Sequence, residues 1–73
     1  MNKKINKKSG SNGGVQSVEI GTGVLLAVMS GGGPMSLKSI AEATSLPPAK
    51  AHRYLVSLIR SGLVEQDAAT GKY

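Results

Sequence analysis

The stretch that decides the fold is residues 36–73, SLKSIAEATSLPPAKAHRYLVSLIRSGLVEQDAATGKY. Apolar residues at helical spacing predict a short helix over about 38–44 and a second helix that starts near Pro48. Proline suits that first helical position, because its φ is fixed and its missing N–H is not needed there. The turn Ser45-Leu46-Pro47 separates the two helices, with Ser45 at the position that glycine usually takes, and Gly62 stops the second one. Two helices joined by so short a turn are the pattern of a helix-turn-helix.

A strand and a turn are expected after the second helix. Residues 63–67 are apolar where they would meet a core, and residues 68–71 predict a turn because Gly71 accepts a positive φ. Lys72-Tyr73 then opens a returning strand, which gives a small β wing over residues 63–73. A two-stranded wing should extend further than this, so we expect the wing to be truncated and the sequence to be part of a longer protein.

A third helix is expected upstream, over about 18–29, with Ser17 placed to cap it. Gly21 and Gly23 oppose this helix, since each costs on the order of 1 kcal/mol against alanine. The residues that fall at helical spacing in this segment are Val18, Thr22, Leu25 and Val28 or Met29. The three helices and the wing predict a mainly α fold, a three-helix winged helix-turn-helix over residues 15–73, with the helix-turn-helix at about 37–61.

Composition excludes several classes of function. The chain has 73 residues, enough for one small domain, and it contains no Cys, which rules out disulfides, Cys-ligated zinc and thiol chemistry. A single histidine cannot supply the roughly four ligands of a zinc site. No nucleophile–base pair or carboxylate dyad is present, so we expect no metal, no cofactor and no enzymatic activity. The longest strongly apolar run, residues 24–29, is too short for a signal peptide or a membrane span, which favours a cytoplasmic protein without membrane contact.

Positive charge is concentrated in two places. The formal net charge is +5, and residues 1–14 hold four lysines and no acid, which predicts a disordered basic N-terminal arm. The remainder of the chain is nearly neutral. Between Glu42 and Glu65, however, no acidic residue interrupts a group of basic ones. The second helix of the pair is therefore basic within a near-neutral domain.

A basic second helix in a helix-turn-helix predicts binding to double-stranded DNA, with a recognition helix at about 48–61 in the major groove. Lys50 and Arg53 are the strongest candidates for contact, because an Arg side chain can bind guanine O6 and N7 as a fork and a Lys can do so or hold a phosphate. Arg60 is expected to be an ordinary solvent charge. The other candidates are residues at helix starts, the histidine and the wing lysine, namely Ser36, Lys38, Pro48, Ala49, His52 and Lys72.

Four short motifs in fixed order resemble the N-terminal DNA-binding domain of IclR-type bacterial transcriptional regulators. They are Ala43 with Leu46-Pro47, then His52-Arg53, then Gly62-Leu63-Val64-Glu65, then Thr70-Gly71-Lys72-Tyr73. The resemblance covers about residues 15–73. It implies a transcription regulator that binds a palindrome-like operator as a homodimer or higher oligomer. It also implies that a small-molecule effector acts only through a C-terminal domain, which these residues do not contain.

Two alternatives remain open. A winged helix of this kind can serve as a protein–protein interaction or dimerisation module without specific DNA binding, but such a module would leave the helix at 48–61 neutral or acidic and would expose an apolar patch. The second alternative is non-specific electrostatic binding by the arm alone. Removing residues 1–14 separates the arm from the folded part.

Overall fold

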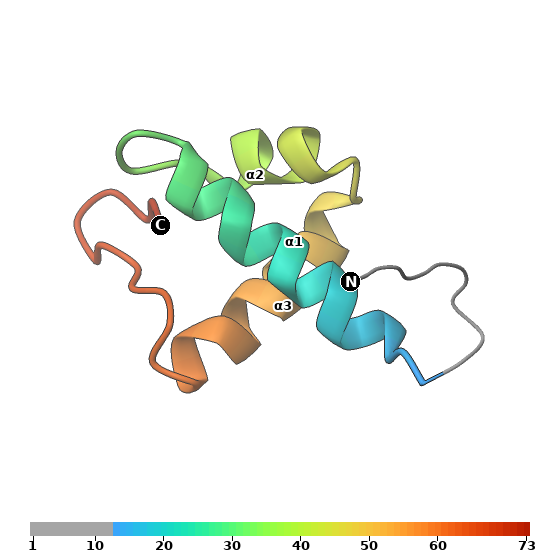
Figure 1. Ribbon diagram of the computed structural model, residues 1–73. Coiled ribbons are helices and arrows are strands. Elements are labelled where there is room, and N and C mark those ends of the chain that lie inside the picture. Colours follow the sequence, from blue (N-terminus) through green and yellow to red (C-terminus); the bar gives the residue numbers. More distant parts are fainter. Residues whose placement is uncertain (1–12) are drawn as a thin grey trace.

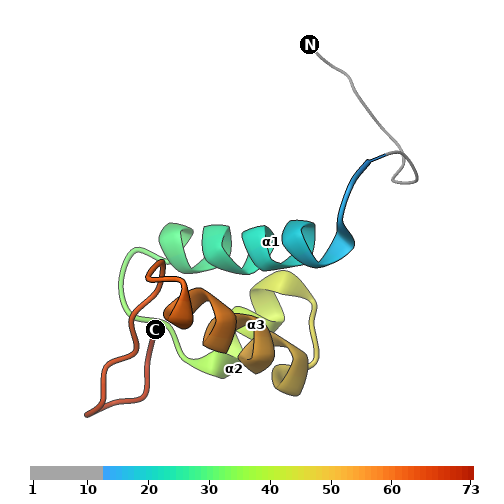
Figure 2. The ribbon, with the colours of Figure 1, turned by 90° about the horizontal axis from the view of Figure 1, so that it is seen from below.

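The computed structural model describes residues 13–73, so the expectation for the basic arm falls almost entirely outside the described residues. Three helices make up the fold: α1, Gln16–Ser30; α2, Leu37–Thr44; and α3, Pro48–Arg60. Figures 1 and 2 show α1 lying across one side of the α2–α3 pair, and each helix packs against the other two. The predicted three-helix, mainly α architecture is confirmed.

α1 begins earlier and ends later than predicted, and its cap is not the expected residue. Val15 occupies the N-cap position without a side-chain hydrogen bond, so Ser17 lies inside the first turn and does not cap the helix. The helix runs without a break through Gly21 and Gly23. Packing against two other helices stabilises α1 more than the two glycines weaken it, because tertiary contacts supply most of the stability of helices in proteins.

The face of α1 that turns inward is not the one indicated by the spacing of its apolar residues. Val24 is fully buried, whereas Val18 and Met29 are 63% and 68% exposed. Thr22 is exposed as well, whereas Leu25 and Val28, two of the predicted residues, are partly buried and pack against the core. Since α1 is apolar on both faces, periodicity alone did not identify the buried one.

Aliphatic side chains from all three helices, with Val64 from the segment after α3, form the core. Two alanines, Ala41 of α2 and Ala51 of α3, are also buried at 4% and 0% exposure. Small residues at these positions let the two helices approach closely. The buried cluster that holds the domain together consists of Val24, Ile40, Leu55 and Val64.

The turn between α2 and α3 has the geometry of a left-handed helix cap. Ser45 adopts φ 58° and ψ 34°, as expected for the position that glycine usually takes. The Leu46 N–H donates to the Ala41 carbonyl at 3.0 Å, and the Ser45 N–H donates to the Glu42 carbonyl at 3.3 Å. Leu46 then packs against the core. These contacts offset the roughly 1 kcal/mol of strain that a non-glycine residue carries in this conformation.

The predicted β wing is not formed in residues 13–73, which contain no strand. Met35 and Tyr73 do exchange both backbone hydrogen bonds at 2.8 Å, which is the pattern of one antiparallel pair. The Asp67 N–H also donates to the Lys72 carbonyl at 2.8 Å. A strand needs several consecutive pairs, and isolated ones do not make a ladder. Residues 63–67 therefore remain irregular.

Candidate DNA-binding surface

The outward face of α3 carries a stripe of polar and basic side chains. Ala51 and Leu55 turn inward and are fully buried. Positions about half a turn away from them face solvent, because successive residues of a helix are rotated by about 100°. The exposed side chains on this face are Lys50, Arg53, Ser57 and Arg60, at spacings typical of one helical stripe.

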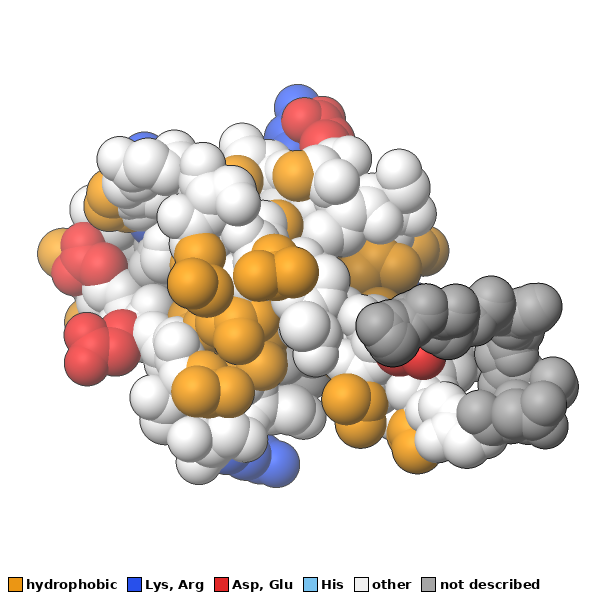
Figure 3. Space-filling view, in the orientation of Figure 1, with side chains coloured by type: hydrophobic (Ala, Val, Ile, Leu, Met, Phe, Trp, Pro, Cys, Tyr) orange, Lys and Arg blue, Asp and Glu red, His pale blue; other side chains and the backbone are white. Residues whose placement is uncertain are grey.

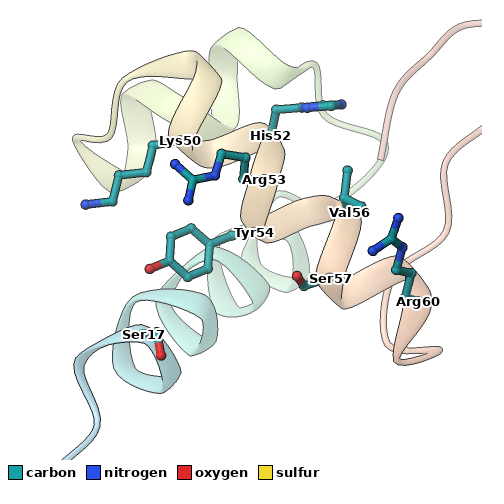
Figure 4. A pocket seen from close by; sticks show the side chains of 8 residues that line it. All are labelled: Ser17, Lys50, His52, Arg53, Tyr54, Val56, Ser57 and Arg60. Carbon is teal, nitrogen blue, oxygen red and sulfur yellow. The ribbon is translucent and has the colours of Figure 1, made fainter.

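An open groove of about 480 Å³ lies along this stripe, and no carboxylate lines it. Figure 4 shows Lys50 and Arg53 on the side of α3 that faces the start of α1. His52 points away to the other side. A cationic groove without an opposing acid is suited to a polyanion. The lining residues are Ser17, Lys50, His52, Arg53, Tyr54, Val56, Ser57 and Arg60.

Of the site residues expected from sequence, the groove contains Lys50, His52 and Arg53. Pro48 and Ala49 are exposed in the first turn of α3 and do not line it. Among residues 13–73, no group of three His, Cys, Asp or Glu side chains, with or without His52, could hold a metal ion.

The remaining candidates are Ser36, Lys38 and Lys72. They lie close in sequence to the backbone pair that Met35 forms with Tyr73. That backbone pair sets Ser36 next to Lys72 along the two paired segments. The Ser36 hydroxyl accepts from the Ser39 N–H at 3.1 Å and donates to the Ser39 hydroxyl at 3.0 Å, so it caps α2. Lys38 and Lys72 are exposed and do not line the groove.

The turn before Lys72 is held by the Asp67 carboxylate. One carboxylate oxygen accepts from the Thr70 hydroxyl at 2.8 Å and the other from the Ala69 N–H at 3.3 Å. These bonds, the one from Thr70 most strongly, hold the pKa of Asp67 below its usual value. Gln66 adds a bond from its amide to the Gly71 carbonyl at 3.0 Å. Lys72 is thus presented from an ordered turn although no strand flanks it.

Sequence reasoning missed Ser17, Tyr54, Val56, Ser57 and Arg60 as lining residues of the groove. The spacing Lys50, Arg53, Ser57, Arg60 is a signal that would have found two of them, since these positions share one helical face. Ser17 and Tyr54 carry no such signal. They meet only because α1 packs beside α3.

A protein-family model described as the IclR helix-turn-helix domain matches residues 17–68. The chain belongs to this family. The match runs from the first turn of α1 to the turn after α3, so it includes both helices of the helix-turn-helix and the groove residues between Ser17 and Arg60. An IclR helix-turn-helix domain serves DNA binding and transcription regulation and has no catalytic role.

Searches of curated proteins and of solved structures found no match to this chain. In residues 13–73, none of the helices has the length and apolar character needed to cross a membrane.

Proposed function

We propose that this IclR-type domain binds double-stranded DNA in a sequence-specific manner, as the DNA-binding part of a cytoplasmic transcriptional regulator. The observation that carries the proposal is the acid-free basic face of α3 within a helix-turn-helix of this family. In this proposal α3 enters the major groove, where Arg53 and Lys50 reach base edges and phosphates.

Two further cations, outside α3, contact the DNA backbone in this proposal. Lys38 in the first turn of α2 and Lys72 after the wing turn contact phosphates, which fixes the orientation of the domain without reading sequence. Pro48 and Ala49 permit close approach of the helix start. His52 contributes a contact from the opposite side of α3.

The proposal is tested by removing the charge of the arm. We expect a variant with Lys3, Lys4, Lys7 and Lys8 replaced by Ala to keep binding duplex DNA in a fluorescence anisotropy titration. Its affinity should depend less steeply on salt, because up to four fewer cations displace counterions from the DNA. If the variant loses binding altogether, the arm alone is responsible. The folded domain would then be better understood as a protein-interaction module.

We further propose that two copies of the domain associate through the outer face of α1. Figure 3, in the orientation of Figure 1, shows hydrophobic side chains gathered on the side of the molecule where α1 lies. Glu19 is the only charge in α1. The resemblance to regulators that act on palindrome-like operators favours a second copy as the occupant of this face. The exposed apolar residues of this face are Val15, Val18, Leu26 and Met29.

Val18→Glu tests the association. We expect this variant to be monomeric in sedimentation equilibrium over a concentration series in which the parent chain dimerises, because a carboxylate in an apolar interface is desolvated without a partner. Gln16→Glu is the matched control, since Gln16 is exposed in the same turn but outside the apolar stripe. A parent chain that stays monomeric, or an equal effect of both variants, would refute this interface.

A further inference from the structure

Tyr54 lies at the junction of α1 and α3, beside Gly21 of α1. Its side chain is half-buried and packs against the edge of the core. A Cβ atom added to Gly21 of α1 would lie 3.4 Å from Cδ1 and 3.8 Å from Cε1 of the Tyr54 ring. The ring therefore lies beside α1, so near that a methyl group added at Gly21 would be in van der Waals contact with it.

The Tyr54 ring separates two different surfaces. On one side it lines an apolar groove of about 320 Å³ between α1 and α3, together with Val18, Leu25 and Leu58. On the other side it lines the cationic groove with Lys50 and Arg53. Packing in the apolar groove would be served equally well by phenylalanine. The apolar groove therefore does not explain the hydroxyl, and we look for its role in the cationic groove.

The Tyr54 hydroxyl has no hydrogen-bond partner among residues 13–73, since none of the side-chain hydrogen bonds there involves it. Figure 4 shows it pointing out of the fold, on the side of α3 where Lys50 extends and toward the turn of α1 that contains Ser17. The result is an oriented donor on a rigid ring beside two cations.

We propose that the Tyr54 hydroxyl donates a hydrogen bond to a phosphate oxygen of the DNA strand that runs beside α3, and so fixes the register of this helix. The proposal rests on the DNA-binding function proposed above and adds a positioning contact to it. A phosphate is the chemical match because the site combines a neutral donor with neighbouring positive charge. Tyr54 lies about 100° around α3 from Arg53, toward α1. When Arg53 faces the base edges in the DNA major groove, the Tyr54 hydroxyl therefore faces the phosphates along its side.

Tyr54→Phe tests this contact, because it removes the hydroxyl and keeps the ring against Gly21. With the full chain and two unrelated duplexes of about 20 base pairs, we expect roughly three- to tenfold weaker binding, the range for one hydrogen bond. The factor should be the same at every salt concentration, since an uncharged group releases no counterion. Lys50→Ala, in contrast, should lower the slope of log affinity against log salt by about one.

Tyr73→Phe is the matched control, because it removes the hydroxyl of the only other tyrosine. It should bind as the parent does. Titrations are made well below the thermal midpoint of each variant, so that any loss of stability does not enter the result. Unchanged binding of Tyr54→Phe would overturn the contact, and a loss on one duplex alone would mean a base contact in place of a phosphate. If the parent binds and Lys50→Ala weakens it while Tyr54→Phe does not, only the Tyr54 contact fails; a parent without duplex binding refutes the proposed function itself.

Discussion

Replacing Lys50 and Arg53 together by Ala is expected to weaken binding to duplex DNA by about a hundredfold or more at physiological salt. A well-placed Arg fork on a guanine contributes about 1–3 kcal/mol, and a lysine on a phosphate adds a further electrostatic contribution. The two side chains lie on the exposed face of α3 and take no part in the core, so the domain should remain folded. Fluorescence anisotropy measures the affinity, and circular dichroism checks the helix content.

The matched control for charge is Lys3→Ala with Lys4→Ala, which removes two positive charges from the N-terminal arm. If the contribution of α3 is specific, this control should lower the slope of log affinity against log salt by at most about two, and its loss of affinity should be smaller than that of the α3 double variant. Equal losses in the two double variants would mean that only total charge matters. The recognition role of α3 would then be wrong.

Leu55→Ala is expected to produce the largest loss of stability of any single truncation in α3. Leu55 is fully buried in the cluster formed with Val24, Ile40 and Val64. Removing such a side chain costs about 2–5 kcal/mol, from lost transfer free energy and the cavity that remains. A domain of this size has a total stability on the order of 5 kcal/mol. We therefore expect a largely unfolded variant at 37 °C in thermal melts followed by circular dichroism.

Leu26→Ala provides the comparison, since Leu26 is 53% exposed on the outer face of α1. This variant should unfold within a few degrees of the parent. Should Leu26→Ala prove as damaging as Leu55→Ala, the helix packing described above would be contradicted. The comparison also checks the assignment of the inner and outer faces of α1, on which the proposed association depends.

The helix-turn-helix itself was predictable from local sequence because local signals fix it. Pro48 starts α3, Gly62 takes a positive φ just after it, and Ser45 adopts the left-handed conformation expected between the helices. The clear polar and apolar faces of α2 and α3 indicated which side chains are buried. Lys50 and Arg53 were found for the same reason, since they lie opposite the buried stripe of a strongly amphipathic helix.

What only the tertiary structure decided concerns contacts between segments distant in sequence. α1 has apolar residues on both of its faces, so its inner face was settled by packing against α2 and α3, with Val24 inside and Val18 outside. The wing was predicted from turn chemistry, but a strand requires a partner, and the backbone pairs made here are too few to form one. Tyr54 lines the cationic groove because α1, which packs beside α3, brings Ser17 to the same place. Local sequence determines helices and their polar faces through short-range geometry. Which faces of two helices come into contact depends on side-chain packing between distant segments, and the spacing of apolar residues does not predict it.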